Sequence, residues 1–443
     1  MSPLRAHARA IWQAAVAAAD PFALVRDALT NPPPELRSAL TSAQRILVVG
    51  GGKAGAAMAD GVEAALADRL DVIRGVVNVP AEAVRPLRAI RLHAARPAGT
   101  NQPTAEGVAG VRDILALVRS AQPGDVCLCV LSGGGSALLP APADGLTLDD
   151  KQRVTLLLHA CGATIDEMNC VRKHLSAIKG GRLAQAFTGA DRSLFSLIVS
   201  DVIGDPLDVI ASGPTAADPT TFADALNILV RYGLEAQTPA AVLDYLRRGC
   251  QGAIPETLKT LPPGITNVVI GNNHHSLAVA AARAESLGYH VLNLGSFIEG
   301  ETRQVATALA GIVRSVRLDG VPARPPFCLL LGGETTVTLT PGHGKGGRNQ
   351  EFVLAATLKL GQAGLRDVVV LSGGTDGEDG PTDAAGAFAD ADTLARAASL
   401  GLNPLAYLDR HDAYTFFNAT GDLLRTGLTG TNVMDVRVIL VGS

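Results

Sequence analysis

Residues 46–68 read ILVVGGGKAGAAMADGVEAALAD, an apolar run that ends in glycines and continues as an alanine-rich stretch. The apolar run predicts a buried strand at 46–49, and the stretch after the glycines predicts a helix at 53–68. A strand that passes through a glycine loop into a helix is the repeating unit of a parallel α/β sheet. The sequence therefore predicts an α/β fold.

The same alternation of short apolar runs and alanine- or leucine-rich stretches continues along the chain, and it predicts a mainly parallel sheet. A proline-rich segment at 255–264 interrupts it, and 443 residues exceed what a single core usually holds. We therefore predict two domains, a larger Rossmann-like N-terminal domain at 1–263 and a smaller α/β C-terminal domain at 264–443. Further strands are expected at 72–79, 126–131, 194–199, 266–270, 289–294, 327–331, 335–340, 367–371 and 434–441.

Composition narrows the classes of function. The net charge is -4 and aromatic residues make up only 4% of the chain, so neither the basic surface nor the stacking platforms of a nucleic-acid-binding protein are expected. No apolar run reaches the roughly 18 residues of a membrane helix, so no membrane partner is expected either. The cysteines form no CxxC pair, which fits a reducing compartment. We expect a cytoplasmic protein.

Several predicted strands end directly in glycines. In open α/β sheets ligands bind outside the carboxyl ends of strands, and glycine lets backbone N–H groups approach an anion closely. We therefore expect a polyanionic ligand in a cleft between the two domains. These strand ends are VVGGGKAG (48–55), VLSGGGSA (130–137), VIGNN (269–273), LLLGGETT (329–336) and VLSGGTDG (370–377).

The loop at 50–55 admits three interpretations. It satisfies G-x-G-x-x-G, the pattern of dinucleotide-binding folds. The next predicted strand, however, ends at 77–80 without the acidic residue that would hold an adenine ribose, and Lys53 adds a charge that binding by a helix dipole does not need. A phosphate or carboxylate cradle that includes Gly51, Gly52 and Lys53 is therefore preferred, and a structural turn is the third interpretation.

A second candidate anion cradle consists of Ser132, Gly133, Gly134, Gly135 and Ser136. Its backbone N–H groups and two hydroxyls would bind phosphate, whereas the alternative is a plain flexible loop. A serine nucleophile elbow is excluded because G-x-S-x-G would require glycine at position 138, where leucine stands.

A dense basic segment at 169–182 mixes charged with apolar residues and contains a Lys-Gly-Gly sequence near its end. Runs of charge usually form a solvated surface, but this mixture favours a helix or loop that lines a cleft. Lys173 and Lys179 are its candidate phosphate-binding residues.

Carboxylates follow two of the predicted strands. Asp201 and Asp205 have no cation close in sequence, and oxygen ligands of this kind hold Mg²⁺ beside nucleotide phosphates. Asp379 and Asp383 lie in a glycine turn whose spacing is not that of an EF-hand. They are candidates for ligand binding and for the general base.

The segment 342–351, GHGKGGRNQE, is rich in both glycine and cations and precedes a helix expected to begin near Asn349. An anionic transition state needs several fixed donors. Lys345, Arg348 and Asn349 can supply them together with the helix N-terminus. Glu334 lies in the glycine turn that follows the strand predicted at 327–331, and it is a further candidate for ligand binding.

Taken in order, these stretches resemble the class II glycerate 2-kinases with their MOFRL-type C-terminal domain. The resemblance covers nearly the whole chain, from about residue 10 to 441. The matching pieces are GGGKAG (50–55), LSGGGSALL (131–139), NCVRKHLSAIKGGRLA (169–184), SDVIGDPLDVIASGPT (200–215), GGETTV (332–337), GKGGRNQE (344–351), SGGTDGEDGPTDAAGA (372–387) and TGDLLRTGLTGTNVMD (420–435).

The resemblance implies phosphorylation of D-glycerate by ATP and Mg²⁺, giving 2-phosphoglycerate and ADP, at a site between the two domains. The family's motif lysine falls on Lys53 and its motif arginine on Arg348, so these are the expected catalytic residues. Members of the family are often labelled hydroxypyruvate reductases, so an NAD(P)H-dependent reductase is one alternative. A non-catalytic nucleotide- or hydroxy-acid-binding protein is the other. The assembly state of the chain is left open, with a homo-oligomer as one option.

From these expectations follows a mechanism. Lys53 and Arg348 would neutralise the transferring phosphoryl group and the glycerate carboxylate. The glycines at 133–135 would cradle the nucleotide phosphates with Ser136 and with help from Lys345. Asp201 and Asp205 would hold Mg²⁺ directly or through water. Such a reaction depends on positioning and electrostatics more than on covalent chemistry.

Overall fold

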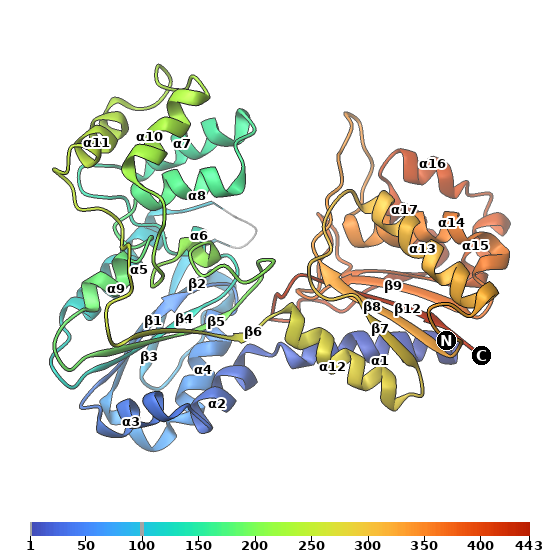
Figure 1. The fold of residues 1–443 in the computed structure, drawn as a ribbon, viewed down its shortest axis with the longest axis horizontal. Coiled ribbons are helices and arrows are strands. Elements are labelled where there is room, and N and C mark those ends of the chain that lie inside the picture. The colour runs from blue at the N-terminus through green and yellow to red at the C-terminus, as the bar shows by residue number, and fades with distance from the viewer. Residues whose placement is uncertain (1, 98–101) are drawn as a thin grey trace. The chain divides into compact units, whose positions relative to one another are not determined.

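The computed structural model describes residues 2–97 and 102–443. The chain forms two compact units (Figure 1). One comprises Pro21–Ile270, and we call it the parallel-sheet unit. The other, the mixed-sheet unit, combines the segment up to Asp20 with Gly271–Ser443.

The parallel-sheet unit is built around a six-stranded sheet with the order β3-β2-β1-β4-β5-β6. Every registered pair from β3 to β5 is parallel. This is the strand order of doubly wound dinucleotide-binding folds, in which the order reverses between the first and fourth strands. Its elements are α2 (Pro21–Thr30), α3 (Pro34–Ser42), β1 (Ile46–Gly51), α4 (Gly55–Ala65), η1 (Ala67–Val72), β2 (Ile73–Pro80), η2 (Ala81–Ala83), β3 (Ile90–Arg96), α5 (Ala105–Arg119), β4 (Val126–Leu131), α6 (Gly135–Leu138), α7 (Leu148–Ala160), α8 (Ile165–His174), α9 (Arg182–Phe187), β5 (Ser193–Val199), η3 (Ile210–Ser212), α10 (Phe222–Arg231), α11 (Ala240–Cys250) and β6 (Ile265–Gly271).

The central strands are apolar along their whole length because they are covered on both faces. β1 and β4 are buried at every position, as expected for parallel strands between helices. Helices α7, α8, α10 and α11 form a separate layer at one end of this unit (Figure 1), with an apolar core of their own that includes Val154, Phe222 and Leu246. The basic segment of the sequence enters this layer as α8, which a capping box of Thr164 and Glu167 begins.

The mixed-sheet unit contains a second six-stranded sheet, ordered β11-β10-β9-β12-β8-β7. β12 runs antiparallel to both β8 and β9, so its first residue lies beside their last residues. Its elements are α1 (Pro3–Ala18), α12 (Asn273–Ser286), β7 (His290–Asn293), α13 (Thr302–Asp319), β8 (Phe327–Gly333), α14 (Arg348–Gly364), β9 (Val368–Gly374), β10 (Gly386–Ala389), α15 (Ala391–Ser399), α16 (Pro404–Asp409), α17 (Ala413–Thr420), β11 (Leu423–Leu424) and β12 (Asp435–Val441).

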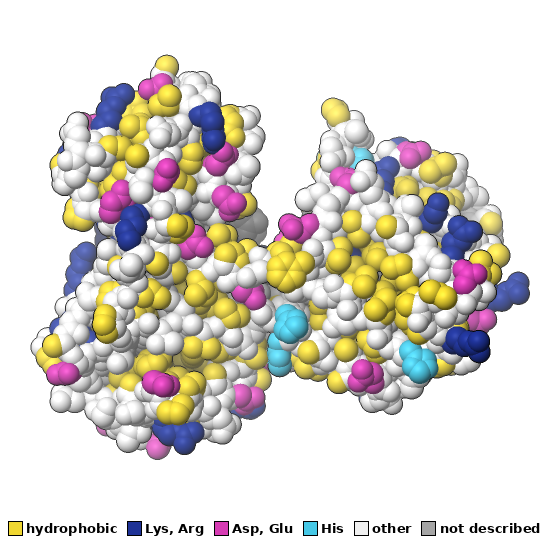
Figure 2. Space-filling model, in the orientation of Figure 1, with side chains coloured by type: hydrophobic (Ala, Val, Ile, Leu, Met, Phe, Trp, Pro, Cys, Tyr) yellow, Lys and Arg dark blue, Asp and Glu magenta, His cyan; other side chains and the backbone are white. Residues whose placement is uncertain are grey.

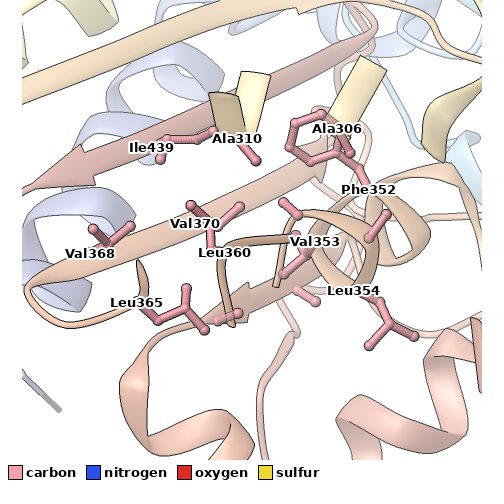
Figure 3. Packing of buried hydrophobic residues seen from close by; sticks show 14 of the residues in the cluster. Ala306, Ala310, Phe352, Val353, Leu354, Leu360, Leu365, Val368, Val370 and Ile439 are labelled. Carbon is pink, nitrogen blue, oxygen red and sulfur yellow. The ribbon is translucent and has the colours of Figure 1, made fainter. Parts of the chain in front are cut away.

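Helix α14 is the central packing element of this unit. Phe352 and Val353 are fully buried and pack with Val370 of β9 and Ile439 of β12 (Figure 3). Truncation of a buried phenylalanine of this kind to alanine lowers the free energy of unfolding by about 3–5 kcal/mol. The packing fixes the N-terminal end of α14, where Arg348 stands, relative to the ends of the sheet strands.

The structure divides the chain differently from the sequence-based boundary at 263/264. The N-terminal helix α1 belongs to the mixed-sheet unit because Ile11, Trp12 and Ala15 are buried in the core on one face of its sheet. The strand at 265–271 was expected to open the second domain, yet it pairs at the edge of the first sheet as β6. Periodicity identifies strands and helices, but it does not tell which sheet they join.

The strand expected at 335–340 is wrong. Gly333 ends β8, and beyond it only Thr336 makes an isolated bridge, to Glu301. Alternating threonine and β-branched residues favour a strand locally, but no strand of the described residues lies beside this stretch to complete a ladder.

Candidate active site

The loops after β1 and β4 lie at the switch point of the parallel sheet and are bonded to each other. The backbone N–H of Lys53 donates to the carbonyl of Gly133 at 2.8 Å, and the N–H of Ala54 donates to Oγ of Ser132 at 3.1 Å. A Cβ on Gly52 would stand 2.0 Å from that same Oγ. Glycine is therefore required at position 52 because the two loops approach closely. The N–H groups of Lys53 and Ala54 bond the second loop, so they are not available to a ligand.

The side chain of Lys53 lies across the second loop. A Cβ on Gly134 would come within 3.1 Å of Cγ of Lys53, and a Cβ on Gly133 would stand 2.2 Å from Oδ2 of Asp201. The structure thus brings Lys53, the Ser132–Gly135 turn and the Asp201 carboxylate together. Lys53 is exposed, and its ammonium has no hydrogen bond or ion pair within residues 2–97 and 102–443.

A strained turn supports the far side of this loop. Ala211 and Ser212 both have positive φ, 53° and 61°, which costs about 1–3 kcal/mol for each such residue. Oγ of Ser212 lies 2.8 Å from Oγ of Ser136. Nζ of Lys179 donates to the carbonyl of Ser136 at 2.8 Å. Strain kept by several surrounding contacts is typical of functional sites.

Lys173 has a different environment from the one expected. Its buried ammonium pairs with Asp208 at 3.1 Å and with Asp218 at 2.8 Å. Burial lowers the pKa of Lys173, but the two carboxylates more than offset this and raise it. Because two carboxylates already neutralise this cation, Lys173 stabilises the fold here and does not have the phosphate-binding role predicted for it. Asp208 correspondingly serves as an ion-pair partner.

The predicted metal ligands are only partly assembled. Asp201 lies against the Gly133 turn, and Asp205 follows it in a left-handed conformation with φ of 54°. Within the part of the chain that the structure describes, no group of three or more His, Cys, Asp or Glu side chains could hold a metal ion. A cation held by one or two carboxylates together with substrate phosphates does not need such a group.

In the mixed-sheet unit Arg348 is held by two carboxylates. Its Nε and Nη2 donate to the two oxygens of Asp435, at 2.7 and 3.1 Å, and its Nη1 pairs with Glu334 at 2.8 Å. The side chain remains 34% exposed. Burial lowers the pKa of Arg348, but Asp435 and Glu334 outweigh it and raise the pKa above its usual range. A bidentate pair of this kind fixes the plane of the guanidinium.

Asp435 is fully buried between two arginines. It also accepts from Nη2 of Arg437 at 2.9 Å, and Arg437 itself has no exposed surface. Burial raises the pKa of Asp435, but the charges of Arg437 and Arg348 reverse this and lower it. The antiparallel register explains its position, because Asp435 pairs with both Gly333 and Gly374 at the ends of β8 and β9.

The N-terminus of α14 is capped from outside the helix. Oδ1 of Asp379 accepts from the N–H of Asn349 at 3.0 Å, and its Oδ2 accepts from the N–H of Gln350 at 2.8 Å. Burial raises the pKa of Asp379 to about 7 in spite of these bonds. The helix N-terminus that was expected to receive an anionic ligand is therefore occupied by this carboxylate. Asn349 also bonds Asp435, at 2.8 Å.

Lys345 and Asp383 meet at a different place, around Tyr414. Nζ of Lys345 stands 4.3 Å from the centroid of the Tyr414 ring. The hydroxyl of Tyr414 donates to Asp383 at 2.7 Å, and Arg425 pairs with the same carboxylate at 3.1 Å. Both interactions lower the pKa of Asp383. Asp379 and Asp383 thus belong to separate clusters although they are close in sequence.

Sequence reasoning missed Asp435 and Arg437. The only signal for Asp435 was its place at the end of the matching stretch at 420–435. Arg437 lies inside an apolar run, and nothing in that run indicates that its guanidinium bonds Asp435 and Thr335.

In the described part of the chain no helix is long and apolar enough to cross a membrane. On the visible face of each unit, Lys and Arg side chains stand apart among acidic and uncharged ones (Figure 2), so this face carries no continuous basic patch.

The six-stranded, mainly parallel sheet, with two glycine loops at the point where its strand order reverses, defines a doubly wound α/β protein. Comparison with known proteins refines this. The family described as "domain of unknown function (DUF4147)" matches residues 7–247, and the MOFRL family matches residues 327–435.

Relatives cover nearly the full chain. A glycerate 2-kinase of Pyrococcus horikoshii is 38% identical over 90% of this chain and 88% of its own. A glycerate kinase of Mus musculus is 38% identical over 99% of this chain and 93% of its own. A protein of Agrobacterium vitis named putative hydroxypyruvate reductase is 44% identical over 98% and 94%. A crystal structure of the Thermotoga maritima glycerate kinase superimposes with a TM-score of 0.88 at 34% identity, covering 99% of each chain.

The chain therefore belongs to the DUF4147/MOFRL family of glycerate kinases, as its motifs predicted.

Proposed function

We propose that the protein transfers a phosphoryl group from ATP to the 2-hydroxyl of D-glycerate in the presence of Mg²⁺, giving 2-phosphoglycerate and ADP. The observation that carries the proposal is the unpaired ammonium of Lys53 beside two glycine loops at the switch point of a doubly wound sheet. Unpaired cations at such a position fit a phosphorylated ligand. The glycerate kinases among the relatives supply the acceptor.

In the parallel-sheet unit, Lys53 would neutralise charge on the transferring phosphoryl group. The backbone of Gly133–Gly135 and the hydroxyl of Ser136 would hold the nucleotide phosphates. Charge stabilisation by fixed donors accounts for most of the catalysis of phosphoryl transfer. The bonds between the two loops support this role, because a preorganised loop does not have to rearrange during the reaction.

Mg²⁺ fits the parallel-sheet unit at Asp201. The carboxylate lies against the Gly133 turn, beside the loop proposed to hold the nucleotide phosphates, and Mg²⁺ in such sites is bound by one or two carboxylates together with phosphate oxygens. When bound, the ion would neutralise phosphate charge. The protein's own contribution would be to keep these oxygens beside the nucleotide-binding turn.

In the mixed-sheet unit, Arg348 would bind an anionic group of the substrate or of the transition state. Asp435 would orient the guanidinium, and Glu334 would yield Nη1 to the substrate, since 43% of the Glu334 side chain is exposed. We propose that both units serve one reaction.

Neither Asp379 nor Asp383 suits the role of general base. Both oxygens of Asp379 already accept backbone hydrogen bonds at the start of α14. Asp383 is held by Tyr414 and Arg425, which lower its pKa. A loose phosphoryl-transfer transition state needs little deprotonation of the acceptor, so the mechanism does not depend on either carboxylate.

A hydroxypyruvate reductase is the second candidate, because the 44% identical Agrobacterium vitis protein is named as a putative one. The end of β2 argues against it. Asn78, at the position where a dinucleotide fold carries its ribose-binding acid, is fully buried, and its Nδ2 donates to the carbonyls of Gly107 and Leu138.

The test is a coupled assay of the purified protein with D-glycerate, ATP and Mg²⁺, run beside hydroxypyruvate with NADH or NADPH. Release of ADP that depends on D-glycerate, with 2-phosphoglycerate identified by NMR, is the expected result. Oxidation of the cofactor by hydroxypyruvate without ADP release would instead make the β1 loop a dinucleotide site.

A further inference from the structure

The parallel-sheet unit contains a cavity of about 580 Å³ behind the second glycine loop. Ser136 and Ala137 form part of its lining, and α7 and the basic segment supply the rest. Three cationic side chains reach it, Lys151 from α7, Arg172 from α8 and Lys179 from the turn after α8. The mechanism proposed above uses neither Lys151 nor Arg172.

Among residues 2–97 and 102–443, no carboxylate forms an ion pair with any of these three cations. The Arg172 guanidinium makes no hydrogen bond or ion pair within residues 2–97 and 102–443 although it is half-buried. Lys151 reaches only the carbonyl of Ala141, at 3.5 Å. Lys179 is 2% exposed, and its Nζ contacts two serine oxygens. A charge without a counter-ion is costly to bury. One buried cation and two half-buried cations, none with a carboxylate beside it, indicate a site that an anion completes.

The three cations are also close enough to repel one another. Burial, and after it the charge of Arg172, lowers the pKa of Lys151 to about 7. Burial and the charges of Arg172 and Lys151 hold the pKa of Lys179 well below its usual range. The other charged or titratable groups that line the cavity are Asp149, Arg153 and His159, and all three are exposed. The single carboxylate does not balance the cations.

We propose that this cavity binds the nucleoside triphosphate, with Lys151, Arg172 and Lys179 holding its polyphosphate chain. The inference rests on the proposed kinase function and assigns residues to its nucleotide site. A triphosphate carries enough negative charge to neutralise three cations, whereas the single carboxylate of glycerate would leave two unpaired.

The rest of the lining fits the same ligand. Pro103, Pro140, Leu148 and Leu156 give the cavity apolar walls, against which a base and a ribose can pack, and its volume lies in the range of small-molecule sites. Ser136 belongs both to this cavity and to the proposed phosphate cradle. A triphosphate in the cavity can therefore reach the loop that Lys53 crosses.

The test uses Lys151→Met and Arg172→Met in the full chain, because methionine keeps the length of the apolar stem and removes the charge. Lys359→Met and Arg314→Met, at exposed positions of the mixed-sheet unit, are the matched controls. ATP binding is measured by calorimetry, and KM for ATP and for D-glycerate by the coupled assay. We expect each cavity variant to weaken ATP binding about tenfold or more, as the loss of a charged hydrogen bond does. KM for D-glycerate should stay within about twofold.

Thermal unfolding supplies an independent readout. Without nucleotide, both cavity variants should melt at the wild-type temperature or above it, because an uncompensated charge has been removed. The rise in melting temperature that ATP gives the wild type should shrink in both variants and persist in both controls.

Other outcomes overturn the inference. Unchanged ATP binding in both cavity variants would exclude the cavity as the nucleotide site, and a selective rise in KM for D-glycerate would assign it to the acceptor. The kinase assay on the wild type separates the two proposals. If the wild type turns over D-glycerate and the cavity variants bind ATP normally, the kinase function stands and the assignment of the cavity is wrong. If ATP binding depends on Lys151 and Arg172 but the wild type does not turn over D-glycerate, the assignment of the cavity stands and the proposed kinase function is wrong.

Discussion

The two units differ in how they hold the cations of their candidate sites. In the parallel-sheet unit, Lys53 and Arg172 have no anionic partner among the described residues. In the mixed-sheet unit, Arg348 and Arg437 converge on the buried carboxylate of Asp435, and Glu334 adds a second carboxylate to Arg348. Both units are rich in glycine at strand ends, so the sequence alone makes them look alike.

The difference teaches what each set of charges can do. An unpaired cation beside a cavity is destabilising until an anion arrives, so it favours binding. A cation fixed between two carboxylates is held in one orientation and binds an external anion only by exchanging a partner. The parallel-sheet unit is therefore arranged to attract a polyanion, and the mixed-sheet unit is arranged to hold one guanidinium in place.

The largest effect expected is on stability, from Asp435→Ala. This change leaves Arg437 buried without a counter-charge, which costs about 3–5 kcal/mol. Urea unfolding of the variant should show the loss directly. Asp383→Ala, which removes an exposed ion-pair partner, is the control and should change stability little. Equal effects of the two changes would mean that the buried network is not the stabilising element described here.

Next in size is the effect of Lys53→Ala on the rate. Loss of one transition-state donor commonly lowers the rate by about 10²–10³, and we expect at least that loss in kcat/KM. The melting temperature should not fall, because the Lys53 ammonium has no partner to lose. Near-wild-type activity would remove Lys53 from the mechanism.

Arg348→Ala should lower kcat/KM by a similar factor but also destabilise the fold, since Asp435 loses one of its two arginines. The contrast with Lys53→Ala sharpens the comparison between the units. Arg348→Lys should not restore activity, because a lysine ammonium cannot make the bidentate contact that orients the guanidinium. Full rescue by lysine would show that charge alone matters at this position.

The last effect expected is a pH dependence from Asp379. Its pKa is about 7 in the folded protein and 3.8 ordinarily. The folded state therefore holds this proton more tightly, and the contribution of Asp379 to stability falls as the pH rises from about 4 to about 7. Asp379→Asn keeps a capping side chain and cannot titrate. Between pH 4 and 7 the stability of the wild type should decline relative to this variant, and parallel profiles from urea unfolding would contradict the raised pKa.

Much of the parallel-sheet unit could be predicted from the sequence. β4 matches its expected bounds of 126–131, and β1 and β2 differ from theirs by only a residue or two. Long apolar runs between glycine loops leave few alternatives to buried parallel strands. The meeting of Lys53 with the Ser132–Gly135 turn also followed, because neighbouring parallel strands end at one edge of the sheet.

The charge networks could not be predicted in this way. Lys173 and Lys179 lie in the same basic segment, yet one has two carboxylate partners and the other has none. Their partners come from segments distant in sequence, such as Asp218 and Ser136. Asp435 was missed for the same reason, since its neighbours at Gly333 and Gly374 lie far along the chain.

The sequence by itself determined the α/β class, the glycine loops at the strand ends and the family of the chain, because apolar periodicity and local turn chemistry are properties of contiguous residues. Only the tertiary structure decided which sheet receives β6, which unit receives α1, and which cations are neutralised. Those outcomes depend on strand pairing and on charges brought together across the fold, and Coulomb interactions follow distance in space rather than separation along the chain.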